Sequence, residues 1–420
     1  FSAKDQSYAE SCKSDCEDRW DGMCKEGLGM GSLKLWAKSD NPEKYKEVEK
    51  EDLYVPVMTA VKGGKGSSYD VAKIMKMKYH DFFICVSIKD HKWFYYDEEL
   101  NRWNMDDKGI RLKEKISTEI WLDFNEFQRK ESEAAAVDPD LGESIHAQNA
   151  QNIGKVMNRL KDTPFKSNIM TECEEIFYDK DKQFLDKLDS FNHLLGFNNG
   201  VYDMKLEEFR KGRPEDYISK STGINHINYD PYSVEIMQIN DFYKKICVIE
   251  SVRKYLLIRS ASFLSGSTRD ESFDIYSGKG GNGKSKHMEL MDAVFGDYAV
   301  KLPIQLLTSK RAASNSATPE LARTKGARLC SMQEPDETTK INVGLMKELT
   351  GGDKIQARAL YGDPIEFKPQ FKMVLCCNDK PGLPQNDEGT WRRVRNTEFT
   401  SKFTYPEDIN SDSVLDFKRD

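Results

Sequence analysis

The apolar positions in the first half of the chain predict a small sheet followed by helices. Two segments, DFFICVSI (81–88) and KWFYYD (92–97), are rich in the β-branched and aromatic residues of paired strands. Residues 126–189 carry Glu, Lys, Ala, Gln and Leu at helical spacing, which predicts a helical connector. Turn signals in residues 197–225 predict short strands or loops.

In the second half, apolar runs alternate with polar segments, as expected for buried strands. Such runs begin at Phe273, Ala327 and Phe371, and a further strand ends at Phe399. A helix follows the first run and stops at Gly296. Its buried face is formed by Met288, Met291, Val294 and Phe295. We therefore expect an α/β protein.

The length of 420 residues suggests two or three domains. We place a linker-like N-terminal segment at 1–67, an α/β and helical region at 68–250, and the chemistry-bearing domain at 251–420. No apolar run approaches the ~18–20 residues of a membrane span, so we expect a soluble protein without a membrane partner. The chain starts at Phe1 rather than Met, as a piece of a longer polypeptide would.

The chain carries 63 Lys and Arg against 70 Asp and Glu, a net charge of -7. This balance excludes a polybasic coat protein, so any nucleic-acid contact must be local. The nine cysteines are scattered, which is typical of reduced thiols in an intracellular protein. Cys12, Cys16 and Cys24 could supply three zinc ligands, but no paired C-x-x-C is present and we favour free thiols.

Three further patterns suggest ligand binding but have simpler explanations. No apolar strand precedes the alternating Gly27, Gly29 and Gly31, so we reject a dinucleotide loop. KGGKGSS (62–68) lacks the spacing of a phosphate loop and is expected to be a flexible linker. A set of aromatic residues could stack on bases, although strand spacing favours core packing: Trp93, Phe94, Tyr95, Tyr96 and Trp103.

The segment YSGKGGNGKSKHMELM (276–291) carries the strongest signal. It fits G-x-x-x-x-G-K-[ST] between a predicted strand and a predicted helix, where backbone N–H groups can surround a nucleotide's phosphates. Lys284 would reach the β/γ oxygens and Ser285 would bind Mg²⁺. A chance glycine-rich turn is the alternative. The predicted nucleotide-binding residues are Gly278, Lys279, Gly280, Gly281, Asn282, Gly283, Lys284 and Ser285.

The predicted strand in ARLCSMQEPDE (327–337) ends in acidic residues. Carboxylates at such a position can hold the Mg²⁺ shell and orient the attacking water. We assign Glu334 to the metal shell, and Asp336 or Glu337 to the attacking water. Pro335 interrupts the acids, which leaves the choice of base open. A solvated acidic turn is the alternative.

The strand FKMVLCC (371–377) is followed by Asn378, whose amide can contact a γ-phosphate and the attacking water together. An ordinary turn is the alternative. Arginines lie just before or within the last strand, where one could stabilise transition-state charge on a phosphoryl group. Strand alternation would place Arg393 and Arg395 on one face and Arg392 on the other. Surface arginines on an edge strand are the alternative.

Between these motifs, a short helix ends at Gly351-Gly352 and a hairpin is expected. Lys354 and Arg358 lie four residues apart on this hairpin. Basic residues on a protruding loop can bind nucleic-acid phosphates independently of sequence. An acidic chain can therefore still act on nucleic acid.

The order of these motifs resembles the superfamily 3 helicases of the AAA+ class. The phosphate loop is followed by RLCSMQEPDE (328–337), LMKELTGGDKIQARALYG (345–362), LCCND (375–379) and WRRVR (391–395). The chain is most similar to the helicase portions of poxvirus-type primase-helicases of nucleocytoplasmic large DNA viruses. GSLKLWAKSDNPEKYKE (31–47) and FNNGVYDM (197–204) resemble the segment that joins primase to helicase there.

The resemblance implies a ring, usually a hexamer, that hydrolyses ATP with Mg²⁺ at subunit interfaces and translocates on single-stranded DNA to open a replication fork. It implies a virus-encoded replication protein in the host cytoplasm or a viral replication site, with a primase domain or other replication proteins as partners. By position, Lys284 and Ser285 match the phosphate loop, Glu334 and Asp336 the acidic motif, and Asn378 the sensor asparagine. Lys354 and Arg358 match the pore hairpin, and Arg393, with Arg392 as the fallback, matches the arginine that acts in a neighbour's site.

Two other classes of function remain open on the residues alone. An RNA helicase or packaging motor would use the same core, because nothing in the hairpin recognises a 2′-hydroxyl. A nucleotide-gated scaffold would bind ATP without moving along nucleic acid. The chain also stops soon after Phe403, so we expect the C-terminal winged helix of some relatives to be either absent or cut off.

Overall fold

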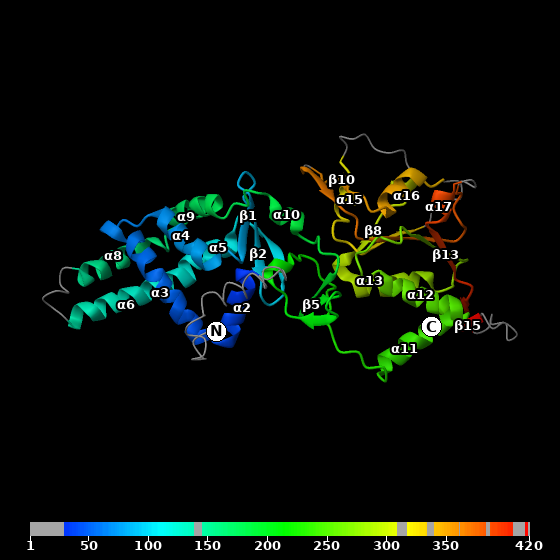
Figure 1. Ribbon diagram of the computed structural model, residues 1–420, viewed down its shortest axis with the longest axis horizontal. Helices are drawn as coiled ribbons and strands as arrows, with labels where there is room; N and C mark the ends of the chain where they lie inside the picture. Colours follow the sequence, from blue (N-terminus) through cyan, green and yellow to red (C-terminus); the bar gives the residue numbers. More distant parts are fainter. Residues whose placement is uncertain are drawn as a thin grey trace, which may run out of the picture. The chain divides into compact units, whose positions relative to one another are not determined.

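The protein is described by a computed structural model that covers residues 29–137, 145–308, 317–333, 340–360, 362–383, 387–405 and 416–418 (Figure 1). The chain divides into two compact units. Unit 1 takes the residues up to Glu98 together with Arg102–Leu185 and Arg213–Tyr217. Unit 2 takes Glu99–Asn101, Asp186–Gly212 and the residues from Ile218 onward. Residues 186–250, which the sequence analysis grouped with the N-terminal region, thus lie mainly in unit 2.

Unit 1 packs helices against a small antiparallel sheet of order β1-β2-β3. The strands are β1 (Phe83–Ser87), β2 (Lys92–Asp97) and β3 (Arg102–Asp107). The helices are α2 (Met30–Asp40), α3 (Pro42–Ala60), α4 (Ser68–Tyr79), α5 (Ile110–Lys115), α6 (Trp121–Val137), α8 (His146–Arg159), α9 (Thr163–Ile176) and α10 (Gln183–Lys187) at the unit boundary. A π-helical turn, Ile116–Ile120, joins α5 to α6. The predicted strands and helical connector are confirmed.

Aromatic side chains form much of the core of unit 1. Trp93 is fully buried, and Tyr96 and Trp103 are nearly so, with their rings in edge-to-face contact. Alternation along β2 points Trp93 and Tyr96 to opposite faces of the sheet, and both faces are covered, so both side chains are buried. Core packing is therefore confirmed as the role of these aromatic residues.

The N-terminal part of the described chain differs from the predicted linker. Residues 30–60 form α2 and α3, because Leu53 and Val57 of α3 enter the core of unit 1. KGGKGSS also has defined structure: Lys62–Gly64 form a 3₁₀ turn and Ser67 caps α4 through its hydroxyl. The sequence did not reveal these long-range contacts, so the prediction of a flexible linker was wrong.

Unit 2 opens with a three-stranded antiparallel sheet of β4 (Leu194–Phe197), β5 (Gly200–Asp203) and β6 (Glu208–Arg210). Two helices follow, α11 (Val234–Ile246) and α12 (Glu250–Ser262). The short strands expected in residues 197–225 are thus confirmed. The six cysteines in the described part of the chain are buried and form no disulfide, as expected; Cys12, Cys16 and Cys24 lie outside it.

The main sheet of unit 2 has five strands in the order β13-β7-β12-β9-β8, all parallel to their neighbours. These are β7 (Phe273–Ser277), β8 (Ala299–Lys301), β9 (Leu329–Gln333), β12 (Lys372–Cys377) and β13 (Val394–Glu398). The central strands β7 and β12 are buried throughout, which explains their continuous apolar runs. The α/β prediction is confirmed, and so are the strands predicted around Phe273, Ala327 and Phe371.

Helices and short strands surround this sheet. α13 (Lys284–Phe295) follows β7, and α16 (Val343–Thr350) precedes a hairpin of β10 (Ile355–Arg358) and β11 (Pro364–Phe367). The remaining elements are α14 (Gln305–Thr308), α15 (Pro319–Ala322), α17 (Glu388–Trp391), β14 (Lys402–Thr404) and β15 (Asp416–Lys418). No helix in the described ranges has the length and apolar composition needed to cross a membrane.

A buried ion pair attaches α12 to the main sheet. Asp274 of β7 is fully buried, and Arg259 of α12 donates to both of its oxygens at 2.6–3.0 Å. Arg259 also contacts Asp270 and Ser272. A buried carboxylate is tolerated only with such partners, so loss of Arg259 would leave an uncompensated charge beside the strand that leads into the glycine-rich turn.

Candidate nucleotide site

The carboxyl ends of the parallel strands converge at one edge of the main sheet. Cys377, the last residue of β12, pairs with Ser277, the last residue of β7, and Cys376 pairs with Gln333 at the end of β9. The residues that follow, Gly278 and Asn378, therefore leave the sheet side by side. In open α/β sheets, this edge is where ligands bind.

The glycine-rich turn uses its glycines for conformations and approaches that other residues would hinder. Gly281 and Gly283 have φ values of 74° and 86°, in the left-handed region. A Cβ on Gly278 would lie 2.4 Å from the Phe399 carbonyl oxygen, and one on Gly283 would lie 2.4 Å from Ile246 Cγ2. The turn then enters α13 at Lys284, so backbone N–H groups and the helix N-terminus face the same edge.

Lys284 and Asn282 brace the turn from within. Lys284 is 8% exposed and its Nζ donates to the Gly278 carbonyl and, at 3.3 Å, to Asn282 Oδ1. Buried Asn282 donates through Nδ2 to the Phe399 carbonyl at 3.1 Å. The structure therefore places the predicted lysine inside the turn, with its ammonium group bonded to the backbone of the turn and to Asn282.

The segment Phe399–Phe403, here called the strap, crosses beside the turn. Phe403 N–H donates to the Gly281 carbonyl at 2.6 Å, and the Ser401 hydroxyl donates to the Lys245 carbonyl of α11 at 2.6 Å. The strap thus joins the turn to α11. This contact could not be predicted from local sequence patterns, because the strap and the turn are over 100 residues apart.

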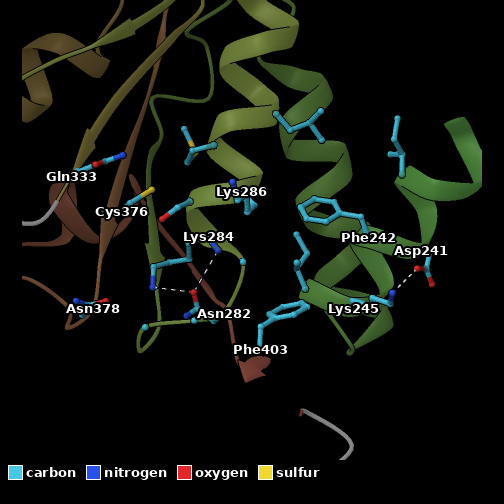
Figure 2. Close-up of a pocket in the computed structure, with 18 of the residues that line it drawn as sticks. Asp241, Phe242, Lys245, Asn282, Lys284, Lys286, Gln333, Cys376, Asn378 and Phe403 are labelled. Carbon is cyan, nitrogen blue, oxygen red and sulfur yellow. Dashed lines mark hydrogen bonds and ion pairs between the residues drawn. The ribbon is translucent and has the colours of Figure 1, made fainter. Parts of the chain in front are cut away.

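A cavity of about 1050 Å³ opens in front of the turn (Figure 2). Residues 280–286 form one wall, and Cys376, Asn378 and Gln333 lie at the strand ends. Phe242 and Lys245 of α11 face the turn from the other side, with Phe403 at its base. Sequence reasoning missed α11 as a wall; the only local signal was the apolar pair Phe242 and Ile246 at i, i+4 spacing.

Just under the turn, α13 buries a histidine. His287 is fully buried, its Nδ1 lies 3.2 Å from the Tyr243 hydroxyl, and its Nε2 has no partner among the described residues. Tyr276 and Phe399 pack against its ring. Burial disfavours the imidazolium and lowers the pKa of His287 to about 4.

Acid should destabilise unit 2 through His287. Because the unfolded histidine has a pKa near 6.5, the unfolded chain binds more protons below that pH, and the free energy of unfolding falls as pH drops from about 6.5 to 4. The contribution of His287 over that range is about 3 kcal/mol. Urea unfolding of wild type and His287→Leu at several pH values tests this. The stability difference between the two proteins should change with pH, and parallel curves would contradict the prediction.

The positions predicted to bind magnesium are described only in part. Ser285 is exposed at the start of α13 and lines the cavity. Glu334, Asp336 and Glu337 lie outside the described residues, although β9 ends at Gln333 on the cavity's edge. Among the described side chains, no cluster of three or more His, Cys, Asp or Glu could hold a metal ion.

Two of the predicted arginines share one carboxylate. Arg392 Nη2 and Arg393 Nη2 lie 2.7 and 2.6 Å from Glu271 Oε2. The expectation that alternation separates them was wrong, because β13 begins only at Val394 and both arginines precede it. Arg393 is 8% exposed and also donates to the Gly389 carbonyl, whereas the Arg392 side chain is 65% exposed.

The predicted hairpin is present. β10 and β11 pair in antiparallel register, with Ile355 opposite Phe367. Ile355 and Ala357 are buried, so alternation exposes Lys354 and Arg358 on the other face. Lys368, exposed directly after Phe367, flanks Lys354 across the hairpin base, a neighbour that sequence spacing did not indicate.

Comparison with known proteins gives two family matches. Residues 72–247 match the family described as D5 N terminal like, and residues 275–393 match a family of unknown function. The chain is 39% identical over 394 residues to "Putative helicase L207/L206" of Acanthamoeba polyphaga mimivirus, covering 93% of this chain and 40% of that protein. It is 22% identical over 446 residues to "Putative primase C962R" of African swine fever virus, covering 98% of this chain and 46% of that protein.

Among solved structures, the C-terminal region of NrS-1 aligns over 46% of this chain and 43% of that chain, with 14% identity and a TM-score of 0.32. Similarity at that level supports no functional inference. The sequence matches are stronger, extend over nearly the whole chain, and come from proteins named as helicases and primases. The chain is thus related to the helicases of primase-helicase type encoded by large DNA viruses, and spans less than half the length of the two relatives compared.

Proposed function

We propose that the chain is the motor portion of an ATP-dependent DNA helicase of the superfamily 3, AAA+ class, working as a ring. One observation carries the proposal: the glycine-rich turn with Lys284 and the tip residue Asn378 leave adjacent parallel strands at one edge of the main sheet. In the sheet order, β12 lies between the turn-bearing strand and β9. That order supports a core in which Asn378 lies between the phosphates and the acids that follow Gln333.

The cavity fits a nucleoside triphosphate. Its volume lies at the upper end of the range of small-molecule sites. Phosphates would bind over the turn and the N-terminus of α13, and the base would lie against the apolar surface of Phe242, Ile246 and Phe403. Ser285 and Glu334 would hold Mg²⁺, which when bound neutralises charge on the transferred phosphoryl group.

The residues of this chain would then act as follows. Lys284 holds the β- and γ-phosphate oxygens, and Asn378 contacts the γ-phosphate and orients the attacking water. Asp336 or Glu337 would accept the proton of that water. These roles rest on position, since the acids follow β9 at the edge where the turn begins.

The arginines support hydrolysis across a subunit interface. Phe273 N–H donates to the Arg393 carbonyl, so the arginines lie at the amino end of β7, while the turn begins after its carboxyl end. Five residues of strand separate these ends by about 16 Å. This separation is too great for an arginine to reach the turn of its own subunit, so Arg392 or Arg393 would serve a neighbouring copy. Because Arg392 is more exposed than Arg393, we favour Arg392, the fallback choice from the sequence, for this role.

The hairpin would contact the DNA strand. Lys354, Arg358 and Lys368 are exposed on a projecting element, and cations there can bind phosphates without recognising sequence. Arg358 Nε donates to the Gly362 carbonyl at 2.9 Å, which holds its guanidinium near the hairpin tip. Movement of this hairpin with the nucleotide cycle would pull the strand.

Strand displacement tests the proposal. Wild type should separate forked DNA in the presence of ATP, whereas Lys354→Ala/Arg358→Ala should bind and hydrolyse ATP but displace less than about a tenth as much strand, because the cations that grip phosphates are gone. A labelled fork with 3′ or 5′ tails, and an RNA fork, give polarity and substrate. Gln356→Ala, an exposed neutral change on the same hairpin, is the matched control.

Each other outcome has a clear meaning. Displacement of the RNA fork alone would replace the DNA helicase with an RNA helicase. Hydrolysis that nucleic acid does not stimulate would favour a nucleotide-gated scaffold. Stimulated hydrolysis without displacement of any fork would favour a packaging motor over a helicase.

A further inference from the structure

Unit 1 carries a group of cations that the proposed motor does not use. They come from the turn before α4, the end of α8 and the residues that follow it, and helices α9 and α5. We call this group the basic surface of unit 1: Lys62, Lys65, Lys113, Lys155, Arg159, Lys161 and Lys166. It includes the KGGKGSS turn, for which the sequence suggested only a linker.

Two contacts link the turn to α8. A Cβ on Gly64 would lie 3.1 Å from Lys155 Cδ, and Arg159 Nη1 donates to the Gly66 carbonyl at 3.4 Å. The guanidinium of Arg159 lies 3.9 Å from the centre of the Phe165 ring at the start of α9. The cations of turn and helix are thus neighbours in space.

Two further contacts extend the surface. Lys113 of α5 donates to the Ser167 hydroxyl of α9 at 3.1 Å, next to Lys166. Lys161, just after α8, lies 3.8 Å from the ring centre of Trp121, the first residue of α6. The basic surface therefore follows a continuous path over four elements of one compact unit.

Three of these cations contact neutral partners: Lys113, Arg159 and Lys161. None of the seven forms an ion pair with a carboxylate in the described part of the chain, whereas Lys34 and Lys115 of the same unit pair with Asp81 and Glu119. Arg159 and Lys161 instead contact aromatic faces. Between Lys155 and Lys166, the acidic residue is Asp162. On a protein with a net charge of -7, this local excess of positive charge is complementary to an anionic partner.

We propose that the basic surface of unit 1 binds the phosphate backbone of DNA. A path of cations over several elements suits a polyanion, and neutralising its phosphates releases counterions without any need to recognise bases. Lys62 and Lys65 flank glycines in the left-handed region, Gly63 and Gly64, which keeps the turn close against α8. The inference goes beyond the proposed motor and needs neither hydrolysis nor a ring.

The test uses the four exposed lysines. Lys62→Ala/Lys65→Ala/Lys155→Ala/Lys161→Ala should bind a fluorescent single-stranded DNA about 10- to 100-fold more weakly at 50 mM salt. Anisotropy at rising salt should show a slope of log K against log salt that is lower by about 3, since each neutralised phosphate contributes about 0.7 on single strands. Both readouts are made without nucleotide.

A matched variant controls for net charge. Lys89→Ala/Lys92→Ala/Lys130→Ala/Lys180→Ala removes four exposed lysines of unit 1 outside the basic surface and should keep wild-type affinity and slope. Hydrolysis of ATP without DNA should be equal in both four-lysine variants. Failure of the proposed motor would appear as absent hydrolysis in wild type, and it would leave the DNA-binding comparison intact.

Several results would overturn the proposal. Equal losses in the two variants would show a bulk charge effect, and unchanged binding in the first would show that DNA lies elsewhere. Wild-type binding to phosphatidylserine vesicles, lost in the first variant while DNA binding persists, would make the surface a membrane contact. If circular dichroism shows that the first variant is unfolded, Lys65→Glu takes its place in the test. This single change on an exposed turn should weaken DNA binding at least threefold.

Discussion

Replacing Lys284 by alanine should lower the rate of ATP hydrolysis by more than about 100-fold while the protein stays folded. The Lys284 side chain is buried at the turn and bonded to the Gly278 carbonyl. No other described lysine of the turn is buried in this way. In the proposed site, the β- and γ-phosphates of ATP would then lose the cation nearest to them. Phosphate release and thermal unfolding, measured together, separate the catalytic effect from a structural one.

The structural effect of Lys284→Ala should be small. The side chain contributes hydrogen bonds to Gly278 and Asn282, each with a net value of about 1 kcal/mol. Lys301→Ala is the control: Lys301 of β8 pairs with Asp292 at 2.9 Å on the same unit, and its loss should change turnover less than about twofold. Wild-type hydrolysis by Lys284→Ala would show that the turn is not the nucleotide site.

Arg392→Ala should also abolish hydrolysis, by about 1000-fold, yet leave ATP binding intact. The guanidinium lies on the surface at the far end of β7 from its own turn, so it can stabilise transition-state charge only in a neighbouring copy. Mixing Arg392→Ala with Lys284→Ala subunits should restore part of the activity, because some interfaces then join an intact turn to an intact arginine.

Arg393→Ala separates two roles for the neighbouring arginine. Since Arg393 is buried and bonded to Gly389 and Glu271, its loss should lower the unfolding temperature, whereas Arg392→Ala should not. Arg395→Ala, an exposed change on β13, serves as the control. Rescue in mixtures with Arg393→Ala but not with Arg392→Ala would reverse the assignment, and no rescue in either mixture would argue against an arginine acting across an interface.

The parts of the site that are local in sequence were predictable. The turn from Gly278 to Ser285 needs a fixed spacing of glycines, lysine and hydroxyl, so its pattern is visible in any single sequence. The hairpin around Lys354 was predictable for the same reason. Its confirmation depended on alternation over a few residues rather than on contacts far along the chain.

The parts that depend on packing were not predictable. Only the strand order places Asn378 beside Gly278, since β12 lies next to β7 in space but almost 100 residues away. The α11 wall carries no motif, and its role follows from the bond between Ser401 and Lys245. The expected separation of Arg392 and Arg393 failed because both residues precede β13, where strand alternation does not apply.

Glu271 and the strap lie at opposite ends of one short element. Glu271 contacts the arginines that precede β13, and the strap that follows β13 bonds the turn at Gly281 and Asn282. A five-residue strand in a packed parallel sheet is stiff along its length. If Arg392 moves toward the nucleotide of the next subunit, that movement would also shift the glycine-rich turn of the subunit to which Arg392 belongs. In the proposed ring, hydrolysis at successive sites would then be coupled rather than independent.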